Sequence, residues 1–364
     1  MDPEDVRPGG ARPVMVRIPV EPVEAAVEAD AVDALAEAGN VAVRGPRFGV
    51  ASQGAQDGPR WRVVVAVTQG CPQQARDSLN SLLWFRAKDE TQDREERRAL
   101  LAAVARLESE RVDELTVLGT RYRIVRAEEY AGIGADGIEL PRPTDPEPAT
   151  PDWDRGSREA EIDDGLVLDP DAPVTPSQAA ERLTLRGMAY AGSPYPDDVL
   201  ADSHRALDTH PDVLLLPATF LIVERTGTGW KPGSGLHATA QEARKTLDFS
   251  LTYWEPRMRG LIPMNPGAEI DARTLIADGA ATADSELAAY ARASDQLRAG
   301  RINQLEVHGT VYRIGRARRL LRWGPDGPEG PRPSDTNSHH PDRIHPSLDE
   351  DGNVSYEGDA DDED

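Results

Sequence analysis

The sequence predicts an α+β fold: two tandem copies of one module, each with an antiparallel sheet packed by helices. An internal repeat covers most of the chain, and within each copy helical runs with one apolar face alternate with β-rich runs. The composition, 38% hydrophobic and 29% charged, is that of a folded, water-soluble protein.

The repeat is clearest before the end of each copy. Residues 114–145 and 304–335 are identical without a gap at 17 of 32 positions. Upstream, NVAVRGPRFGVA from Asn40 matches DVLLLPATFLIV from Asp212. A match of this length is not a chance event, so we interpret it as two copies of one structural unit. The shared positions that we expect to be structural are Gly119, Tyr122, Arg126, Asp136, Gly309, Tyr312 and Asp326.

The repeat defines the domain organisation. We place repeat 1 at 20–148 and repeat 2 at 175–338, after a flexible N-terminus at 1–19. Residues 149–174 are rich in proline and carboxylates, which predicts an extended, solvated linker. Residues 339–364 are acidic and almost without apolar side chains, so we expect a disordered tail.

Each copy begins with a helix, at 23–38 and at about 196–209, followed by strands at 41–51, 61–68 and 213–223. The next helix has a clear start in copy two, where Thr239 and Glu242 form a capping box. Cys71 stands at the matching place in copy one, so it is expected to be an N-cap.

A further helix in each copy carries an apolar stripe that should pack on the sheet. In copy one the stripe contains Leu100, Val104 and Leu107, and in copy two Leu287, Tyr290 and Leu297 fill the same role.

A β-hairpin follows that helix. Gly119 and Thr120 suit a two-residue type II′ turn, a register that pairs Val117 with Tyr122. The alternation then predicts one buried face, which contains Leu115, Val117, Tyr122 and Ile124 in copy one. Arg123 and its match Arg313 should lie on the open face.

Arg126 and Arg316 have the parity of the buried face, so each needs a carboxylate partner. The shared pairs Asp136/Asp326 and Asp145/Asp335 could supply it. An anion-binding site is the alternative.

Net charge and cysteine content restrict the class of protein. A net charge of −23 disfavours general binding to nucleic acid or anionic lipid. The single cysteine, Cys71, fits a reducing cytoplasm, and no segment is apolar enough for a signal peptide or a membrane span. We therefore expect a cytoplasmic protein with no membrane partner.

The motifs of common cofactor and metal sites fail on context. Gly132, Gly134 and Gly137 match GxGxxG, but no helix start follows to hold a pyrophosphate. The seven histidines lack the close spacing of a structural zinc site. We thus assign no catalytic, cofactor-binding or metal-binding residue.

One local cluster of arginines stands out in this acidic chain. Such a cluster could bind an acidic protein, a phosphate backbone or the chain's own tail, and the alternative is a solvated, partly self-paired surface. Copy one has Glu128 and Glu129 at the positions of Arg318 and Arg319, two arginines of this cluster, so any such site belongs to copy two. The candidate binding patch consists of Arg313, Arg316, Arg318, Arg319, Arg322 and Trp323.

The segments SLNSLLWFRAKDE, ERVDELTVLGTRYRIVRAEEY, THPDVLLLP and RRLLRWGPDGPEGPRPSD resemble an uncharacterised actinomycete family of internally duplicated proteins. The resemblance covers nearly the whole chain and implies a bacterial cytoplasmic setting. It implies no activity, cofactor or site residue, because the family is a domain of unknown function.

Our first hypothesis is a non-catalytic intracellular binding or adaptor protein with protein partners, because the hairpin core is retained while exposed charge diverges between the copies. A nucleic-acid-associated regulator using the arginine patch is the first alternative. An enzyme with a site between the two modules is the second.

Overall fold

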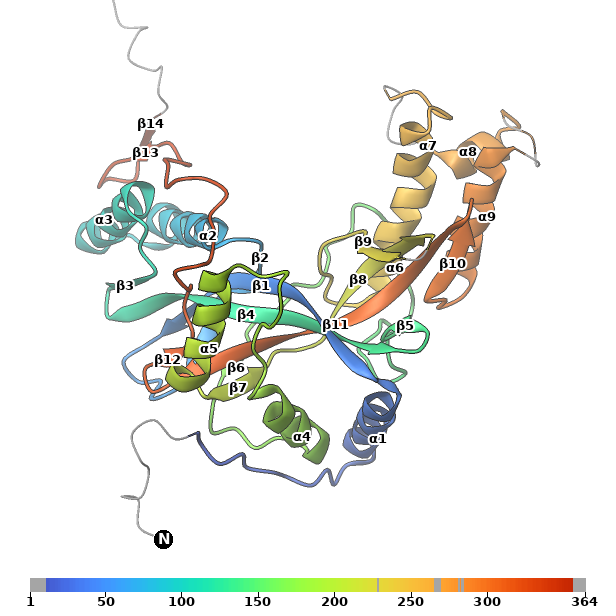
Figure 1. Cartoon of the computed structure of the whole chain (residues 1–364). Helices are drawn as coiled ribbons and strands as arrows, with labels where there is room; N and C mark the ends of the chain where they lie inside the picture. Colours follow the sequence, from blue (N-terminus) through green and yellow to red (C-terminus); the bar gives the residue numbers. More distant parts are fainter. Residues whose placement is uncertain (1–10, 228, 265–269, 281, 283–284, 356–364) are drawn as a thin grey trace, which may run out of the picture.

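The computed structural model shows an α+β fold built on one large antiparallel sheet curled into a half-barrel (Figure 1). The structure describes residues 11–227, 229–264, 270–280, 282 and 285–355. Within these residues the sheet has 12 strands, in the order β6-β2-β1-β4-β11-β8-β9, with β3 and β5 paired to β4 and with β7, β10 and β12 paired to β11.

The first half of the chain supplies the strands on one side of the sheet. Its elements are α1 (Pro22–Glu37), β1 (Asn40–Gln53), β2 (Trp61–Gln69), α2 (Pro72–Phe85), the π-helical turn η1 (Arg86–Glu90), α3 (Arg94–Ser109), β3 (Glu114–Val117), β4 (Thr120–Gly134), β5 (Gly137–Ile138) and β6 (Val167–Leu168).

The second half repeats much of this order. Its elements are α4 (Pro176–Leu185), α5 (Asp197–Thr209), β7 (Asp212–Leu215), β8 (Thr219–Thr226), β9 (Gly229–Pro232), α6 (Ala240–Phe249), η2 (Ser250–Trp254), α7 (Glu255–Met258), α8 (Ala272–Ala277), α9 (Glu286–Ala299), β10 (Gln304–Val307), β11 (Thr310–Gly324), β12 (Gly327–Pro328), β13 (Ser347–Leu348) and β14 (Val354–Ser355).

The two repeats join through their longest strands. β4 pairs antiparallel with β11, and Glu129 lies opposite Arg319, the residue that occupies the matching position of the other repeat. The sequence predicts a sheet in each module, whereas the structure has one sheet to which both repeats contribute. Edge pairing explains the difference, because each long strand would otherwise expose a row of unpaired backbone groups.

The buried arginines are paired across the repeats. Arg126 of repeat 1 contacts Asp335 of repeat 2 at 3.0 Å, and Arg316 of repeat 2 contacts Asp145 of repeat 1 at 2.9 Å. The prediction of a carboxylate partner for each arginine is confirmed. The partner comes from the other repeat, which sequence parity could not show.

The hairpin has a different turn from the predicted one. Leu118 and Gly119 both have positive φ, 50° and 77°, which is the conformation of a type I′ turn. Leu115 therefore pairs with Tyr122, two residues away from the predicted register. A shift of two preserves the face, so the prediction of a buried Leu115, Val117, Tyr122 and Ile124 is confirmed.

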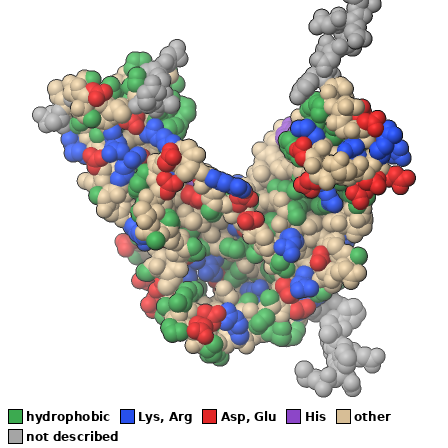
Figure 2. All heavy atoms as spheres, turned by 180° about the vertical axis from the view of Figure 1, so that it is seen from behind, with side chains coloured by type: hydrophobic (Ala, Val, Ile, Leu, Met, Phe, Trp, Pro, Cys, Tyr) green, Lys and Arg blue, Asp and Glu red, His purple; other side chains and the backbone are tan. Residues whose placement is uncertain are grey.

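Two groups of helices rise from the sheet with a wide space between them (Figure 1). We call α2, η1 and α3 the first lobe, and η2 with α6, α7, α8 and α9 the second lobe. Figure 2 shows the molecule from behind, hollowed between the two lobes. The predicted stripes on α3 and α9 are buried in separate cores, and the Thr239 capping box and the Cys71 N-cap are present.

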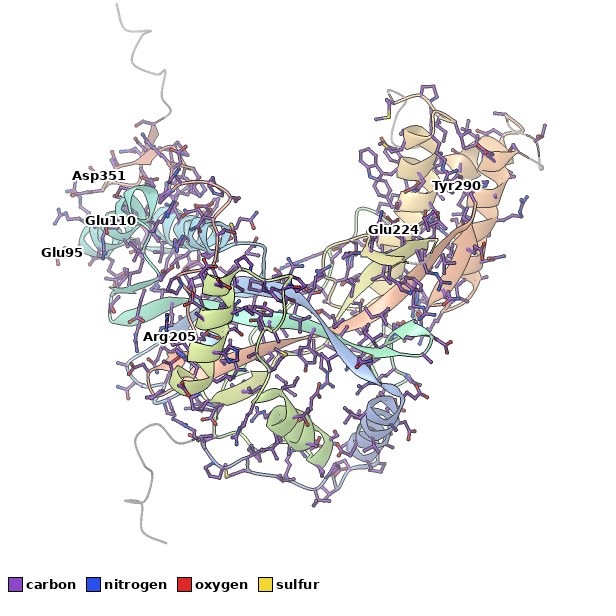
Figure 3. All side chains as sticks on the ribbon, viewed as in Figure 1. Glu95, Glu110, Arg205, Glu224, Tyr290 and Asp351 are labelled. Carbon is purple, nitrogen blue, oxygen red and sulfur yellow. The ribbon has the colours of Figure 1, made fainter. Side chains whose placement is uncertain are left out.

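Residues 339–355 of the predicted disordered tail pack on the first lobe. His345 stacks on Trp84 with ring centroids 4.7 Å apart, and the Trp84 indole donates to the Pro346 carbonyl at 3.2 Å. Asp351, which pairs with Arg94, lies above α3 in Figure 3. The composition of the segment does not predict this contact, because only a few ring contacts and hydrogen bonds to the backbone hold the segment on the lobe. Residues 356–364 lie outside the described residues.

The linker packs in the corresponding way on the second lobe. Arg155 contacts Asp271 at 2.9 Å, and Trp153 packs against the apolar core of that lobe. The segment predicted as a solvated connector is thus held by contacts. Each repeat is followed by a segment that covers the helices of the other repeat. Among the described helices, none combines the length and the apolar character that crossing a membrane requires.

Candidate functional site

The six residues of the predicted patch do not form an exposed surface. Arg319, Arg322 and Trp323 are fully buried, with 1% exposure or less, because β11 is a central strand. Arg319 binds both carboxylate oxygens of Asp163, at 2.5 and 2.8 Å. Arg318 pairs with Glu181. The sequence detects the charge cluster but not its internal partners.

Arg313 and Arg123 were predicted to lie on the open face of the sheet, but both are covered. Arg313 Nη1 donates to the carbonyl of Asp136 at 2.5 Å, and its guanidinium lies 5.0 Å from the Trp230 ring centroid. Arg123 donates in the same way to the carbonyl of Asp326 at 3.0 Å. The turn that follows the long strand of each repeat, β4–β5 or β11–β12, therefore covers the matching arginine of the other repeat.

The glycine run forms the turn between β4 and β5. Gly137 has φ of +114°, and a Cβ there would lie 2.9 Å from Arg313 Nη1. No helix follows this turn, in agreement with the rejection of a dinucleotide motif. The turn instead forms one wall of a cleft.

A large cleft, which we call the α1 cleft, lies between α1, α4 and the ends of β4, β5 and β11. Its open part, between α1 and the β4–β5 turn, has a volume of about 810 Å³. Its apolar end, between α1 and α4, adds about 140 Å³. Ala34, Ala38, Gly132, Glu139 and Arg142 line both parts, so the two parts lie side by side.

Small and aliphatic side chains form the apolar end. α1 contributes Ala34, Leu35 and Ala38, and α4 contributes Ala180 and Leu185. Alanine at these helix positions leaves space that a larger side chain would fill, so the cavity follows directly from the sequence of α1. Ligand sites are typically apolar hollows of this kind with a few convergent polar groups.

A polar group closes the inner wall of the apolar end. The Tyr130 hydroxyl donates to Glu181 at 2.7 Å, and Arg318 pairs with the same carboxylate. Burial, together with Glu181, raises the pKa of Tyr130 well above its ordinary value. Burial opposes the charge of Arg318, but Glu181 outweighs it and raises the pKa of the guanidinium. The wall therefore presents a neutral phenol beside the ion pair of Arg318 and Glu181.

Carboxylates dominate the rim of the open part. Asp33 and Glu37 on α1 are exposed, and neither has an ion pair within the residues that the structure describes. Asp136 is exposed on the opposite wall. Arg142, in contrast, is bonded to Glu139 at 2.6 Å. The rim is thus an acidic surface beside an apolar cavity.

A second hollow, of about 330 Å³, lies between the two repeats. Thr68 of β2, His237 and the linker residues Glu159 and Glu161 are among its lining residues. These carboxylates come from the linker and not from positions that the repeats share. The feature that would favour an enzyme site there, shared charged residues, is not present among its described lining residues.

Sequence reasoning missed Tyr130 and Glu181. Copy two has Leu320 where Tyr130 stands, so a search for shared positions passes over it. Glu181 lies on α4, within repeat 2 but outside the segments that match repeat 1. The signal that could have found Tyr130 is divergence between the copies at a buried position.

Comparison with known families gives one match: the model of a family of unknown function (DUF5954) matches residues 21–338. No curated protein and no solved structure matches the chain.

Proposed function

We propose a non-catalytic binding role for this chain, which belongs to the family of unknown function DUF5954. The partner is a protein that inserts a cationic, partly apolar segment into the α1 cleft. The observation that supports this proposal most strongly is an apolar cavity directly beside exposed, unpaired carboxylates.

The apolar part of the proposed contact extends beyond the cavity. Leu35 and Val41 at its mouth are 43% and 49% exposed, and Val23 and Val27 continue the apolar surface along α1. Exposed apolar surface rimmed by polar groups is typical of protein interaction sites. A partner side chain that fills the apolar end would remove this surface from water.

Charge sets the orientation and the sign of the partner. Arg142, Arg316 and Arg318 of the α1 cleft are bonded to carboxylates, and Arg313 donates to Gln304 and to the Asp136 carbonyl, whereas Asp33 and Glu37 are open to solvent. A segment with lysine or arginine beside its apolar side chain fits this arrangement. The net charge of −23 adds a long-range attraction for cationic partners and repels acidic ones.

We also propose that the chain is a duplicated module, as in the family that it resembles, and that it is located in the cytoplasm. Reciprocal ion pairs at matching positions support descent of both halves from one unit.

The test uses two fluorescent 14-residue peptides, one of leucine and lysine and one of leucine and glutamate. Fluorescence anisotropy should show binding of the lysine peptide alone, weaker at higher salt. Asp33→Lys/Glu37→Lys should reduce its affinity about tenfold or more, because two attractive contacts become repulsive.

The matched control is Asp197→Lys/Asp208→Lys on α5, which makes the same charge change on the corresponding helix of the other repeat. Equal weakening by both double variants would show that only net charge matters. That outcome, or equal binding of the two peptides, would contradict the proposed site.

A further inference from the structure

We infer that the apolar end of the α1 cleft is a socket for one aromatic side chain of the partner. The inference rests on the proposed function and makes its ligand more specific. It comes from a comparison of the α1 cleft with the corresponding place in repeat 2, where the chain fills the site with its own tyrosine.

α5 occupies the place in repeat 2 that α1 occupies in repeat 1. Asp30 of α1 accepts a hydrogen bond from the Thr144 amide at 3.0 Å, and Asp202 of α5 accepts one from the Ser334 amide at 2.8 Å. The ends of the helices agree as well. A Cβ at Gly134 would meet the last carbonyl of α1, and a Cβ at Gly324 would meet the last carbonyl of α5.

Tyr190 fills the site beside α5. Its amide donates to Ser203 Oγ of α5 at 2.9 Å, and its hydroxyl donates to Glu128 Oε2 at 2.5 Å. The ring is buried and stacks on Tyr195, with centroids 4.6 Å apart. Glu128 matches Arg318 in the repeat. Tyr190 therefore reaches the residue that corresponds to the inner wall of the apolar end.

Two neighbours of Tyr190, Arg126 and Glu128, correspond to lining residues of the apolar end, and a third corresponds to a residue one turn away. Ser203 matches Ala31, one turn from Ala34, and Arg126, which acts on the Tyr190 hydroxyl, matches Arg316. The structure thus shows one ring held between a helix and the β4–β11 strands at one end. At the other end it shows a cavity between the corresponding helix and the same two strands.

The volume and chemistry of the cavity fit a single ring. About 140 Å³ is close to the roughly 150 Å³ of an engineered apolar cavity that binds benzene. Where Glu128 accepts from Tyr190, the socket has Arg318, whose Nη1 donates to Glu181. The socket therefore suits a phenyl ring, or a phenol whose oxygen accepts from the guanidinium.

The first test compares four lysine-rich peptides that differ only at one central residue, which is Tyr, Phe, Leu or Ala. Fluorescence anisotropy should rank Tyr and Phe about tenfold or more above Ala, and several-fold above Leu. Equal affinities of the Leu and Phe peptides would overturn the socket and leave the proposed function standing.

Filling the socket should remove the preference for a ring. Ala34→Phe places a ring in the apolar end, and Ala36→Phe, on the exposed side of the same helix, is the matched control. We expect the four peptides to bind Ala34→Phe equally and Ala36→Phe as they bind the unchanged protein. A retained ring preference in Ala34→Phe would contradict the inference.

A second probe, p-cresol, separates the socket from the proposed function. If no peptide binds but p-cresol shifts amide resonances of α1 and α4 and Ala34→Phe abolishes the shift, the proposed function fails and the socket stands. Tyr190→Ala should create a second site, so that p-cresol raises its Tm more than that of the unchanged protein. Absence of any p-cresol effect in both proteins would overturn the inference.

Discussion

The two ends of the central strand pair have the same ion-pair framework but different contents. Beside α5 the site is closed by Tyr190, whereas beside α1 it is an open cavity lined by alanines. The framework of Arg126 with Asp335 and Arg316 with Asp145 is the same at both ends. The comparison teaches that the framework maintains the fold, while the residues between helix and sheet decide whether a ligand can enter.

The two ends also differ in electrostatics. Burial opposes the charge of Arg126, but Glu128, Asp335 and Glu329 outweigh it and raise its pKa. Burial lowers the pKa of Arg316, and the neighbouring Arg318 adds to that effect. A single difference accounts for this contrast, because repeat 1 has Glu128 where repeat 2 has Arg318.

The largest predicted effect concerns these two arginines. Arg126→Met removes the buried ion pairs of Arg126 with Glu128 and Asp335 and should cost about 3–5 kcal/mol of unfolding free energy. Arg316→Met should cost at least about 1 kcal/mol less, because the charge it removes is disfavoured by its surroundings.

Urea denaturation measures both losses, and Arg62→Met, at an exposed position of β2, serves as the control. A larger loss for Arg316→Met would refute the electrostatic contrast between the ends.

A smaller effect is expected from removing one hydroxyl at each end. Tyr190→Phe should cost about 1.5–3 kcal/mol, because a buried bond to a charged carboxylate is lost. Tyr130→Phe should cost about 0.5–1.5 kcal/mol, since Glu181 keeps Arg318 and borders the α1 cleft, where water can replace the phenol. Thermal and urea unfolding would check the order, and equal losses would mean that both ends are equally closed.

The smallest effect is a pH dependence near neutrality from a histidine of the second repeat, since the first repeat contains no histidine. Burial lowers the pKa of His237 below its ordinary value of 6.5. The unfolded chain then takes up a proton at higher pH than the folded one, so this contribution to stability is present above about pH 6.5 and is lost as the pH falls below it.

Gln69 stands at the place of His237 in the first repeat, so His237→Gln gives both repeats the same residue at this position. It should flatten the fall in Tm between about pH 7.5 and pH 5.5, whereas the exposed-site variant His204→Gln should not. An unchanged pH profile in His237→Gln would show that this histidine does not titrate in the window.

Local patterns in the sequence predicted many elements correctly. The capping box at Thr239, the stripe of Leu100, Val104 and Leu107, and the buried face of the hairpin all depend on neighbours a few residues away. The predicted type of the hairpin turn was wrong, because Leu118 adopts a positive φ that the presence of Gly119 alone does not indicate.

The arginine cluster shows where such reasoning stops. The sequence contains the charges of Arg318 and Arg319, but their partners Glu181 and Asp163 lie 137 and 156 residues away in the chain. A charge run whose partners are remote has the same appearance as an exposed patch. The α1 cleft was missed for the same reason, since its walls come from α1, α4 and β11.

The sequence by itself determined the α+β class, the need of Arg126 and Arg316 for carboxylates, and membership of a family of unknown function. Only the tertiary structure decided that the repeats exchange these partners, share one sheet and leave a cavity at one end. The physical reason is range. Helix capping and strand alternation are set by residues close in sequence, whereas strand pairing, ion-pair partners and cavities depend on segments that meet only in the folded chain.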